Sequence, residues 1–444
     1  MKSNRQSSKQ NNRNNNRKQD KPRPPKKRVY DEKITALYAD EDGEIYDAPG
    51  IEALARVGDE IVTLTPDDLI PLPENADLML LPGRSAIGRS HDGIETIAGT
   101  AVAAMLPAGY TRTHLPAFHK QDDAPMLPLY GYTAVVLYHD ALYTTAIYTD
   151  KNDKWDPACY NTHSLKKLIK NVEQDLPNNR LVEHLAHCSL EWHCLTAENL
   201  FYHRWEAGIP TSPACNANCL GCISLQPAEC CPSPQSRIAF RPTVDEVKEI
   251  GVYHLSSAPD AIISFGQGCE GEPSLAADTI AAAIKEIRSA TDKGEININS
   301  NAGYTEGIKK IVDAGLDSIR VSIISARKES YDAYYRAGAS YSLDDVKASI
   351  RYCMENGVYV SLNLLYFPGF NDRPEELSAW QDFIRELKIP MIQMRNLNFD
   401  PDAFLSAMPK SEGKSLGTRS FIERLHETSP ELVIGSFTHF HEKS

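Results

Sequence analysis

Three closely spaced cysteines are the residues of this chain best suited to metal chemistry. In the passage TSPACNANCLGC, Cys215, Cys219 and Cys222 have the spacing C-x3-C-x2-C. Thiolates are soft ligands that bind iron–sulfur clusters or zinc. Three protein ligands leave one iron of a four-iron cluster open for another molecule, whereas a structural zinc site needs a fourth ligand, which Cys230 or Cys231 could supply. The triplet alone therefore leaves both metals open.

Strand-like and helix-like segments alternate after residue 206. Short apolar or β-branched runs are separated by helical stretches of ten or more residues, a pattern that requires parallel strands with crossover connections. Six such units over residues 206–400 predict an α/β fold, a partial (βα)6 barrel. The cysteines follow the first strand, and active-site loops gather at the carboxyl ends of barrel strands. The expected strands are 207–211, 261–265, 295–299, 318–324, 358–366 and 391–397, and the expected helices are 244–255, 276–290, 304–314, a longer stretch to about 356, and 374–387.

The rest of the chain divides into three further segments. Residues 1–30 are predicted to be a disordered basic tail, residues 31–205 an N-terminal α+β domain, and residues 401–444 a C-terminal appendage with a helix at 420–428. In the N-terminal domain we expect strands at 34–38, 79–81, 134–138 and 143–148, and helices at 165–172 and 181–201.

The net charge of −13 combines two opposite populations. Residues 1–28 hold eleven Lys or Arg against one acid, Asp20, so the remainder carries −23. An acidic body argues against a broad phosphate-binding surface. The basic segment lacks apolar residues and is typical of a solvated tail, and RNA contact by this tail is the less favoured alternative.

Hydropathy and cysteine usage indicate the compartment. The chain has no apolar run of the roughly 18 residues that a membrane helix needs, so no membrane partner is expected. The chain has ten cysteines but no recognisable secretory signal. Its most closely spaced cysteines have the spacing of metal ligands, which favours metal binding over a set of disulfide bonds. We therefore expect a cytoplasmic protein.

The motifs that follow the cysteine loop resemble, in their order, those of the radical S-adenosylmethionine (SAM) superfamily. The turn after the second strand contains Gly-Glu-Pro, similar to the turn that in this family contacts the methionine part of SAM. The fifth strand, followed by the sequence PGFND, resembles the molybdenum-cofactor cyclase branch. The resemblance implies SAM contacts at Gly271, Glu272, Pro273, Ser300, Ser322 and Asn363.

The resemblance also implies the activity. A 4Fe-4S cluster held by the three loop cysteines would reductively cleave SAM to a 5′-deoxyadenosyl radical, which abstracts hydrogen from a substrate. The electron donor would be flavodoxin- or ferredoxin-like, and the acidic body favours a peptide, protein or small-molecule substrate over RNA. The alternative is a non-catalytic zinc or iron–sulfur protein. Two positions depart from the family pattern: Gly221 stands where an aromatic residue is usual, and Glu270 precedes Gly271 where a second Gly is usual.

Two residues near this turn and strand are weak catalytic candidates. Cys269 lies inside the turn and could deliver a hydrogen atom or trap a radical, although a small apolar filler is the commoner role of a free Cys. Arg395 ends the sixth strand. It either binds an anionic group of SAM or substrate or forms a buried ion pair with a neighbouring strand.

A second metal site is conceivable in the N-terminal domain. His184, His187 and Cys188 lie three and four residues apart, which places them on one helix face, and Cys194 follows shortly after. Buried Cys and half-buried His on an amphipathic helix are the commoner explanation of such a pattern. His439 and His441 are expected to be exposed, and Cys353 to lie in the core.

Overall fold

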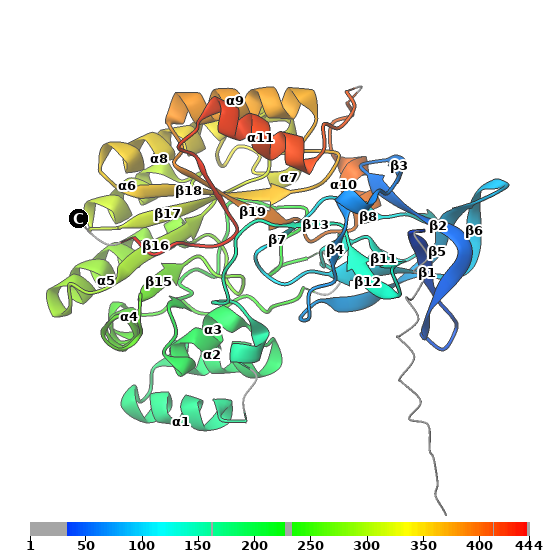
Figure 1. Ribbon diagram of the computed structural model, residues 1–444. Coiled ribbons are helices and arrows are strands. Elements are labelled where there is room, and N and C mark those ends of the chain that lie inside the picture. Colours follow the sequence, from blue (N-terminus) through cyan, green and yellow to red (C-terminus); the bar gives the residue numbers. More distant parts are fainter. Residues whose placement is uncertain (1–32, 161–162, 227–232, 412, 442–444) are drawn as a thin grey trace, which may run out of the picture.

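The computed structural model describes residues 33–160, 163–226, 233–411 and 413–441. Within them, an N-terminal β-rich part is followed by three helices and then by a parallel sheet with its own helices (Figure 1). The α/β class is thus confirmed for the second half of the chain. The predicted basic tail and the Cys230–Cys231 pair lie outside the described residues. None of the described helices has the length and apolarity that crossing a bilayer demands.

The parallel sheet has seven strands among the described residues, and they follow one another in chain order. Six were expected. The seventh strand comes from the predicted C-terminal appendage, where a run of three residues carries too little periodicity to be recognised. The strands are β14 (Glu206–Gly208), β15 (Ile262–Phe265), β16 (Glu295–Ser300), β17 (Ser318–Ile323), β18 (Tyr359–Tyr366), β19 (Met391–Asn396) and β20 (Val433–Gly435).

Helices cover one face of this sheet and begin where the sequence provides caps. Thr243 accepts a hydrogen bond from the backbone of Glu246, whose carboxylate accepts one from Thr243 N (2.7 Å), and Ser342 repeats the arrangement. The single long helix expected to end near 356 is wrong, because Arg336 adopts a positive φ of 50° and separates two helices. The helices are α4 (Val244–Ser257), α5 (Ala277–Ala290), α6 (Thr305–Asp313), α7 (Lys328–Tyr335), α8 (Leu343–Glu355), α9 (Pro374–Leu387), α10 (Pro401–Ala407) and α11 (Thr418–Thr428).

Side chains alternate between the two faces of the sheet. One set is apolar and fully buried, as at Ile263, Ile319 and Leu362, and belongs to the core that includes the helices. The other set is polar and hydrogen-bonded across strands. Asn297 Nδ2 donates to Ser264 Oγ (3.0 Å), and similar bonds join Ser264 with Glu206 and Gln393 with Ser361. The face of the sheet that carries the polar set is therefore suited to bind a polar ligand rather than to pack against helices.

The N-terminal β-rich part is an antiparallel sheet with two very long strands, β5 and β6, joined by a tight turn at Gly93. Only short strands are predicted here from the sequence, because Gly and Ala weaken the alternation of apolar and polar residues. The sheet strands are β1 (Thr35–Ala39), β2 (Ile45–Val57), β3 (Glu60–Thr63), β4 (Ile70–Pro71), β5 (Asp77–Ser90), β6 (Gly93–Met105), β8 (Leu115–Pro116), β9 (Phe118–Lys120), β10 (Tyr132–Thr133), β11 (Val135–Tyr138) and β12 (Ala141–Thr144), and β7 (Tyr110–Arg112) pairs separately with β13 (Ala146–Tyr148).

Three helices connect the two sheets: α1 (Leu165–Asp175), α2 (Arg180–Glu191) and α3 (Leu195–Tyr202). The predicted single helix over 181–201 is wrong. His193 has a positive φ of 48°, which ends α2 and lets α3 start with Cys194 at its N-cap. The chain therefore changes direction between the end of α2 at Glu191 and the start of α3 at Leu195.

The β-rich part packs on the loops that follow β18 and β19, at the carboxyl ends of the parallel strands (Figure 1). Gly58 N donates to Pro368 O (3.0 Å), and Arg112 Nη2 donates to Leu397 O (2.6 Å). A buried ion pair adds to these contacts, since Arg84 Nη2 lies 2.6 Å from Asp400 Oδ2 with both side chains at most 1% exposed. Segments distant in sequence thus cover that end of the sheet.

Removing one partner of this buried pair is expected to destabilise the protein strongly. Arg84→Met leaves the Asp400 carboxylate buried without its cation, which costs about 3–5 kcal/mol in unfolding free energy. Arg89→Met is the matched control, because Arg89 is 45% exposed and lies 3.9 Å from Glu52, and it should cost less than about 1 kcal/mol. Chemical denaturation of both variants measures the difference, and equal losses would contradict the assignment.

His254 in α4 predicts a pH dependence of stability. Its ring is fully buried against Trp205 O (3.2 Å), and burial lowers its pKa from 6.5 to about 4. Between pH 4 and pH 6.5 the imidazole is protonated in the unfolded chain but not in the folded protein. The free energy of unfolding is therefore highest above pH 6.5 and falls by at most about 3 kcal/mol as the pH drops toward 4. Urea titrations at pH 7 and pH 5 measure this loss, which should be smaller in His254→Gln. An unchanged pH slope in that variant would rule the histidine out.

Candidate functional site

The cysteine loop follows β14 and is anchored to the end of α7. Asn218 N donates to Tyr335 O (3.0 Å), and Leu220 N donates to Tyr334 O (3.1 Å). The Tyr334 hydroxyl lies against Gly221, where a Cβ atom would come within 3.2 Å of it. The aromatic side chain that the loop itself lacks is therefore provided by a helix more than 100 residues further along the chain.

The three loop cysteines are close enough to interact electrostatically with one another. Burial, then the nearby thiols of Cys215 and Cys222, raise the pKa of Cys219. Arg237 Nη2 donates to Cys222 Sγ (3.7 Å). Three soft sulfur donors in one loop, with a cationic hydrogen-bond donor beside one of them, fit a 4Fe-4S cluster that keeps one iron open.

The turn after β15 is bonded directly to the cysteine loop. Gly271 N donates to Ser212 O (2.7 Å), and Glu272 N donates to Ala214 O (2.8 Å). A Cβ atom on Gly271 would lie 2.0 Å from Ala214 O, so only glycine permits this approach. The two segments that the sequence singled out separately form one unit.

Glu270 stood out in the sequence as a departure from the family pattern, but its partners could not be read from the sequence. It is 3% exposed, and its carboxylate accepts hydrogen bonds from Thr211 N (2.7 Å), Ser212 N (2.9 Å), Gly266 N (2.7 Å) and Gln267 N (2.8 Å). Burial raises the pKa of Glu270 to about 7. An acid in a glycine-rich turn was the available signal, because such a position has many free backbone N–H groups to satisfy.

Glu272 joins the same turn to the end of β16. Its carboxylate accepts from Ser300 Oγ (2.6 Å), Asn301 N (2.9 Å) and Ser274 N (3.0 Å), and burial raises its pKa. Asn301 Nδ2 in turn donates to Asn216 Oδ1 (2.7 Å) in the cysteine loop. Glu272 and Ser300 therefore lie in contact with each other, and both side chains serve to hold the turn.

Ser322 and Asn363 are paired neighbours on β17 and β18. Both are half-buried, on the polar face of the sheet. Asn363 Oδ1 is buried and has no hydrogen-bond partner within the described part of the chain. Leaving such an acceptor unsatisfied costs about 1–3 kcal/mol, a cost that a bound hydroxyl would remove.

A cavity of about 350 Å³ lies between the parallel sheet and the N-terminal part, and its charged lining consists of Asp77, Glu206, Arg320 and Arg395. Trp155 and Phe437 add aromatic walls. Arg395 Nη1 donates to a backbone carbonyl, that of Ser436 (2.7 Å), and burial lowers its pKa to about 10. Glu206 on β14 attracts Arg395 electrostatically, without a direct ion pair of Arg395 among the described residues, so both roles considered for this side chain stay predictions.

The C-terminal histidines, which were expected to be exposed, are half-buried. His439 Nε2 lies 2.9 Å from Asp150 Oδ2, and the His441 ring stacks on Tyr359 with centroids 3.7 Å apart. Their sequence, rich in polar residues near the terminus, carried no sign of these long-range partners. Cys353 is fully buried in α8, as expected.

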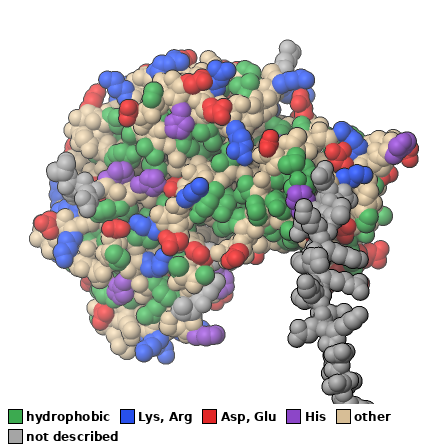
Figure 2. All heavy atoms as spheres, viewed as in Figure 1, with side chains coloured by type: hydrophobic (Ala, Val, Ile, Leu, Met, Phe, Trp, Pro, Cys, Tyr) green, Lys and Arg blue, Asp and Glu red, His purple; other side chains and the backbone are tan. Residues whose placement is uncertain are grey.

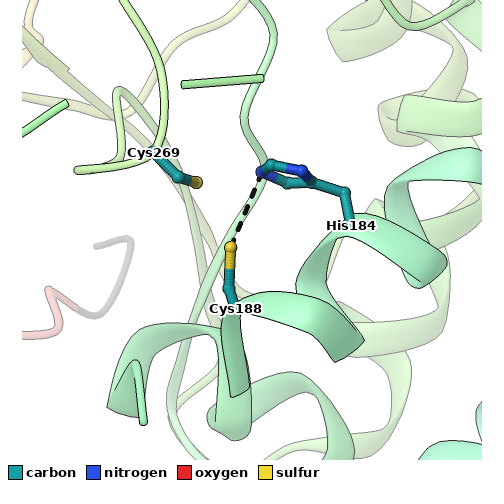
Figure 3. Close-up of side chains that lie close together, drawn as sticks. All are labelled: His184, Cys188 and Cys269. Atoms are coloured by element: carbon teal, nitrogen blue, oxygen red, sulfur yellow. Dashed lines mark hydrogen bonds between the residues drawn. The ribbon is translucent and has the colours of Figure 1, made fainter. Parts of the chain in front are cut away.

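The structure brings together only some of the histidines and cysteines considered for a second metal site. His184 and Cys188 are neighbours, with Nε2 and Sγ 3.6 Å apart, whereas His187 packs its ring on Trp192 with centroids 6.2 Å apart. The third member is Cys269, which the sequence had placed with the SAM turn (Figure 3). The side chain of Cys159 is exposed.

Comparison with known proteins identifies the central segment. Residues 209–380 match the Radical SAM superfamily. The chain is 26% identical over 215 residues to the uncharacterized protein MJ0804 of Methanocaldococcus jannaschii, covering 46% of this chain and 64% of that protein. It is 30% identical over 146 residues to GTP 3′,8-cyclase of Clostridium perfringens, covering 32% of this chain and 40% of the cyclase. The chain thus spans less than two thirds of the length of these relatives.

Solved structures resemble the fold at low identity. HydG, a maturase of the [FeFe]-hydrogenase, gives a TM-score of 0.37 at 16% identity, covering 64% of this chain and 67% of HydG. Methylornithine synthase (PylB) gives a TM-score of 0.36 at 16% identity, covering 61% of this chain and 77% of PylB.

Proposed function

We propose that this chain, whose residues 209–380 match the Radical SAM superfamily, is a radical SAM enzyme that holds a 4Fe-4S cluster through Cys215, Cys219 and Cys222. The observation that carries the proposal is the direct bonding of the cysteine loop to the Gly271–Glu272 turn. When bound, the cluster and SAM supply one-electron cleavage of a carbon–sulfur bond and a 5′-deoxyadenosyl radical that abstracts hydrogen from the substrate.

The chain's own residues bind and orient. We assign SAM contacts to Gly271, Glu272 and Pro273, through the backbone of the turn, and to the side chains of Ser322 and Asn363. The unpartnered Asn363 Oδ1 supports this role, because it is an acceptor without a donor. Ser300 acts here by fixing Glu272 rather than by free contact of its hydroxyl. Glu270 is a positioning residue that sets the turn against the loop.

The finer architecture belongs to the same proposal. We interpret the parallel strands as the partial barrel of the family, with β20 an addition from the C-terminal segment. The domain limits proposed from the sequence are 1–30, 31–205, 206–400 and 401–444. The contacts of β-rich residues with the loops after β18 and β19 support a covering role, which would keep water from a radical intermediate.

The substrate we favour is a small molecule or a peptide side chain that carries an anionic group. Arg320 and Arg395 line the cavity together with the acids Asp77 and Glu206, an arrangement suited to a ligand that carries both a carboxylate and a cationic group. Lys and Arg side chains are interspersed with Asp and Glu on the face shown in Figure 2, which does not favour RNA. The electron donor would be flavodoxin- or ferredoxin-like.

Anaerobic purification and a SAM cleavage assay test the proposal. We expect a brown protein with about four irons per chain that releases 5′-deoxyadenosine from SAM after chemical reduction. A colourless protein that contains zinc at the loop cysteines and leaves SAM intact would favour the non-catalytic alternative. The assay needs no second substrate, because SAM cleavage that is not coupled to hydrogen abstraction from a substrate also releases 5′-deoxyadenosine.

A further inference from the structure

Three metal-ligand atoms converge outside the proposed cluster site. His184 and Cys188 lie one turn apart on α2, and Cys269 reaches them from the turn after β15 (Figure 3). His184 Nε2, Cys188 Sγ and Cys269 Sγ all lie within 4.8 Å of one another. The two segments that supply them are about 80 residues apart in sequence, so no local periodicity explains the convergence.

The surroundings of these atoms suit a metal ion. Cys188 and Cys269 are 1% and 3% exposed, and His184 is half-buried with its ring edge-on to Phe240. None of the three ligands is a carboxylate. Two sulfurs and one imidazole nitrogen in a water-poor site are the donors that zinc prefers over magnesium or calcium.

A fourth sulfur lies beside the trio. Cys194 is bonded to the same helix end, since its backbone N–H donates to Cys188 O (3.2 Å), and its sulfur interacts electrostatically with both Cys188 and Cys269. The change of chain direction at His193, whose φ is positive, places Cys194 next to the end of α2.

We propose that His184, Cys188 and Cys269 bind one zinc ion, with Cys194 as the fourth ligand. The ion is a structural clip: it joins α2 to the turn that carries Gly271 and Glu272. Cys269 is the central link, because Ile238 N donates to its carbonyl (2.7 Å) and the next residue, Glu270, anchors the cysteine loop. The clip requires no redox step and does not depend on the proposed SAM chemistry.

Metal analysis of the full-length protein tests this site. Protein purified without oxygen should contain about one zinc per chain in addition to its iron. In Cys188→Ser and His184→Gln, bound zinc should fall at least about tenfold at limiting free zinc while iron stays unchanged. Cys353→Ser, a buried cysteine far from the trio in sequence, is the control and should keep both metals.

A second measurement covers variants that fold poorly. Cobalt added to metal-depleted wild-type protein should give thiolate-to-cobalt charge-transfer absorption that one equivalent of zinc removes. Cys219→Ala, which lacks a proposed cluster ligand, should still bind the zinc, and this separates failure of the clip from failure of the proposed function. Wild-type protein that binds neither zinc nor cobalt, or a Cys188–Cys269 disulfide in its place, would overturn the proposal.

Discussion

Cys219→Ala is expected to lose the iron–sulfur cluster and with it all measurable 5′-deoxyadenosine release. Cys219 is the middle ligand of the loop and interacts with both Cys215 and Cys222. A four-iron cluster that already lacks a fourth protein ligand has only two left after this change, too few to hold it. Iron content, the visible absorption of anaerobically reconstituted protein and the rate of SAM cleavage measure the effect.

Cys353→Ala is the matched control, because it removes a thiol of the same size from a different place. Cys353 is fully buried in the core, so its truncation should cost about 1–2 kcal/mol of unfolding free energy. Cluster content and SAM cleavage should stay at wild-type levels. Equal loss of the cluster in both variants would mean that the ligands are wrongly assigned.

Gly271→Ala should separate cluster binding from SAM cleavage. The added Cβ would lie 2.0 Å from Ala214 O and 2.5 Å from Ala214 C, so the turn and the cysteine loop must move apart. No cysteine is removed, and we expect iron content to be largely retained. Displacing a binding turn by about 1 Å typically lowers the rate of a positioned reaction about 100-fold, and we expect at least that loss in 5′-deoxyadenosine release.

Gly93→Ala controls for the general effect of adding a methyl group to a glycine. Gly93 has a φ of 121° and nothing within 4 Å of its Cβ position, at the tip of the β5–β6 hairpin. It should cost backbone strain of about 1 kcal/mol and leave SAM cleavage unchanged. If Gly271→Ala cleaves SAM as fast as this control, the turn does not position SAM.

Much of the parallel sheet was predictable because its signals are local. The predicted helix Pro374–Leu387 matches α9 residue for residue, and strand Met391–Leu397 matches β19 to within one residue. Both are long, periodic segments with clear boundary residues. Errors occurred where one residue adopts a positive φ, as at His193 and Arg336, since a single backbone rotation leaves the helical pattern of the sequence intact.

The amino-acid sequence by itself determined the local features on which the proposed chemistry rests: the spacing of three cysteines, the glycine that permits close approach at 271, and the alternation of strands and helices. Only the tertiary structure decided which distant residues support that chemistry. Tyr334 packs at Gly221, Glu270 gathers four backbone N–H groups, and Cys269 meets His184 and Cys188. Spacing along a chain specifies neighbours within a turn or a helix, whereas contacts between separate elements arise from burial of their shared apolar faces, which brings the polar residues along.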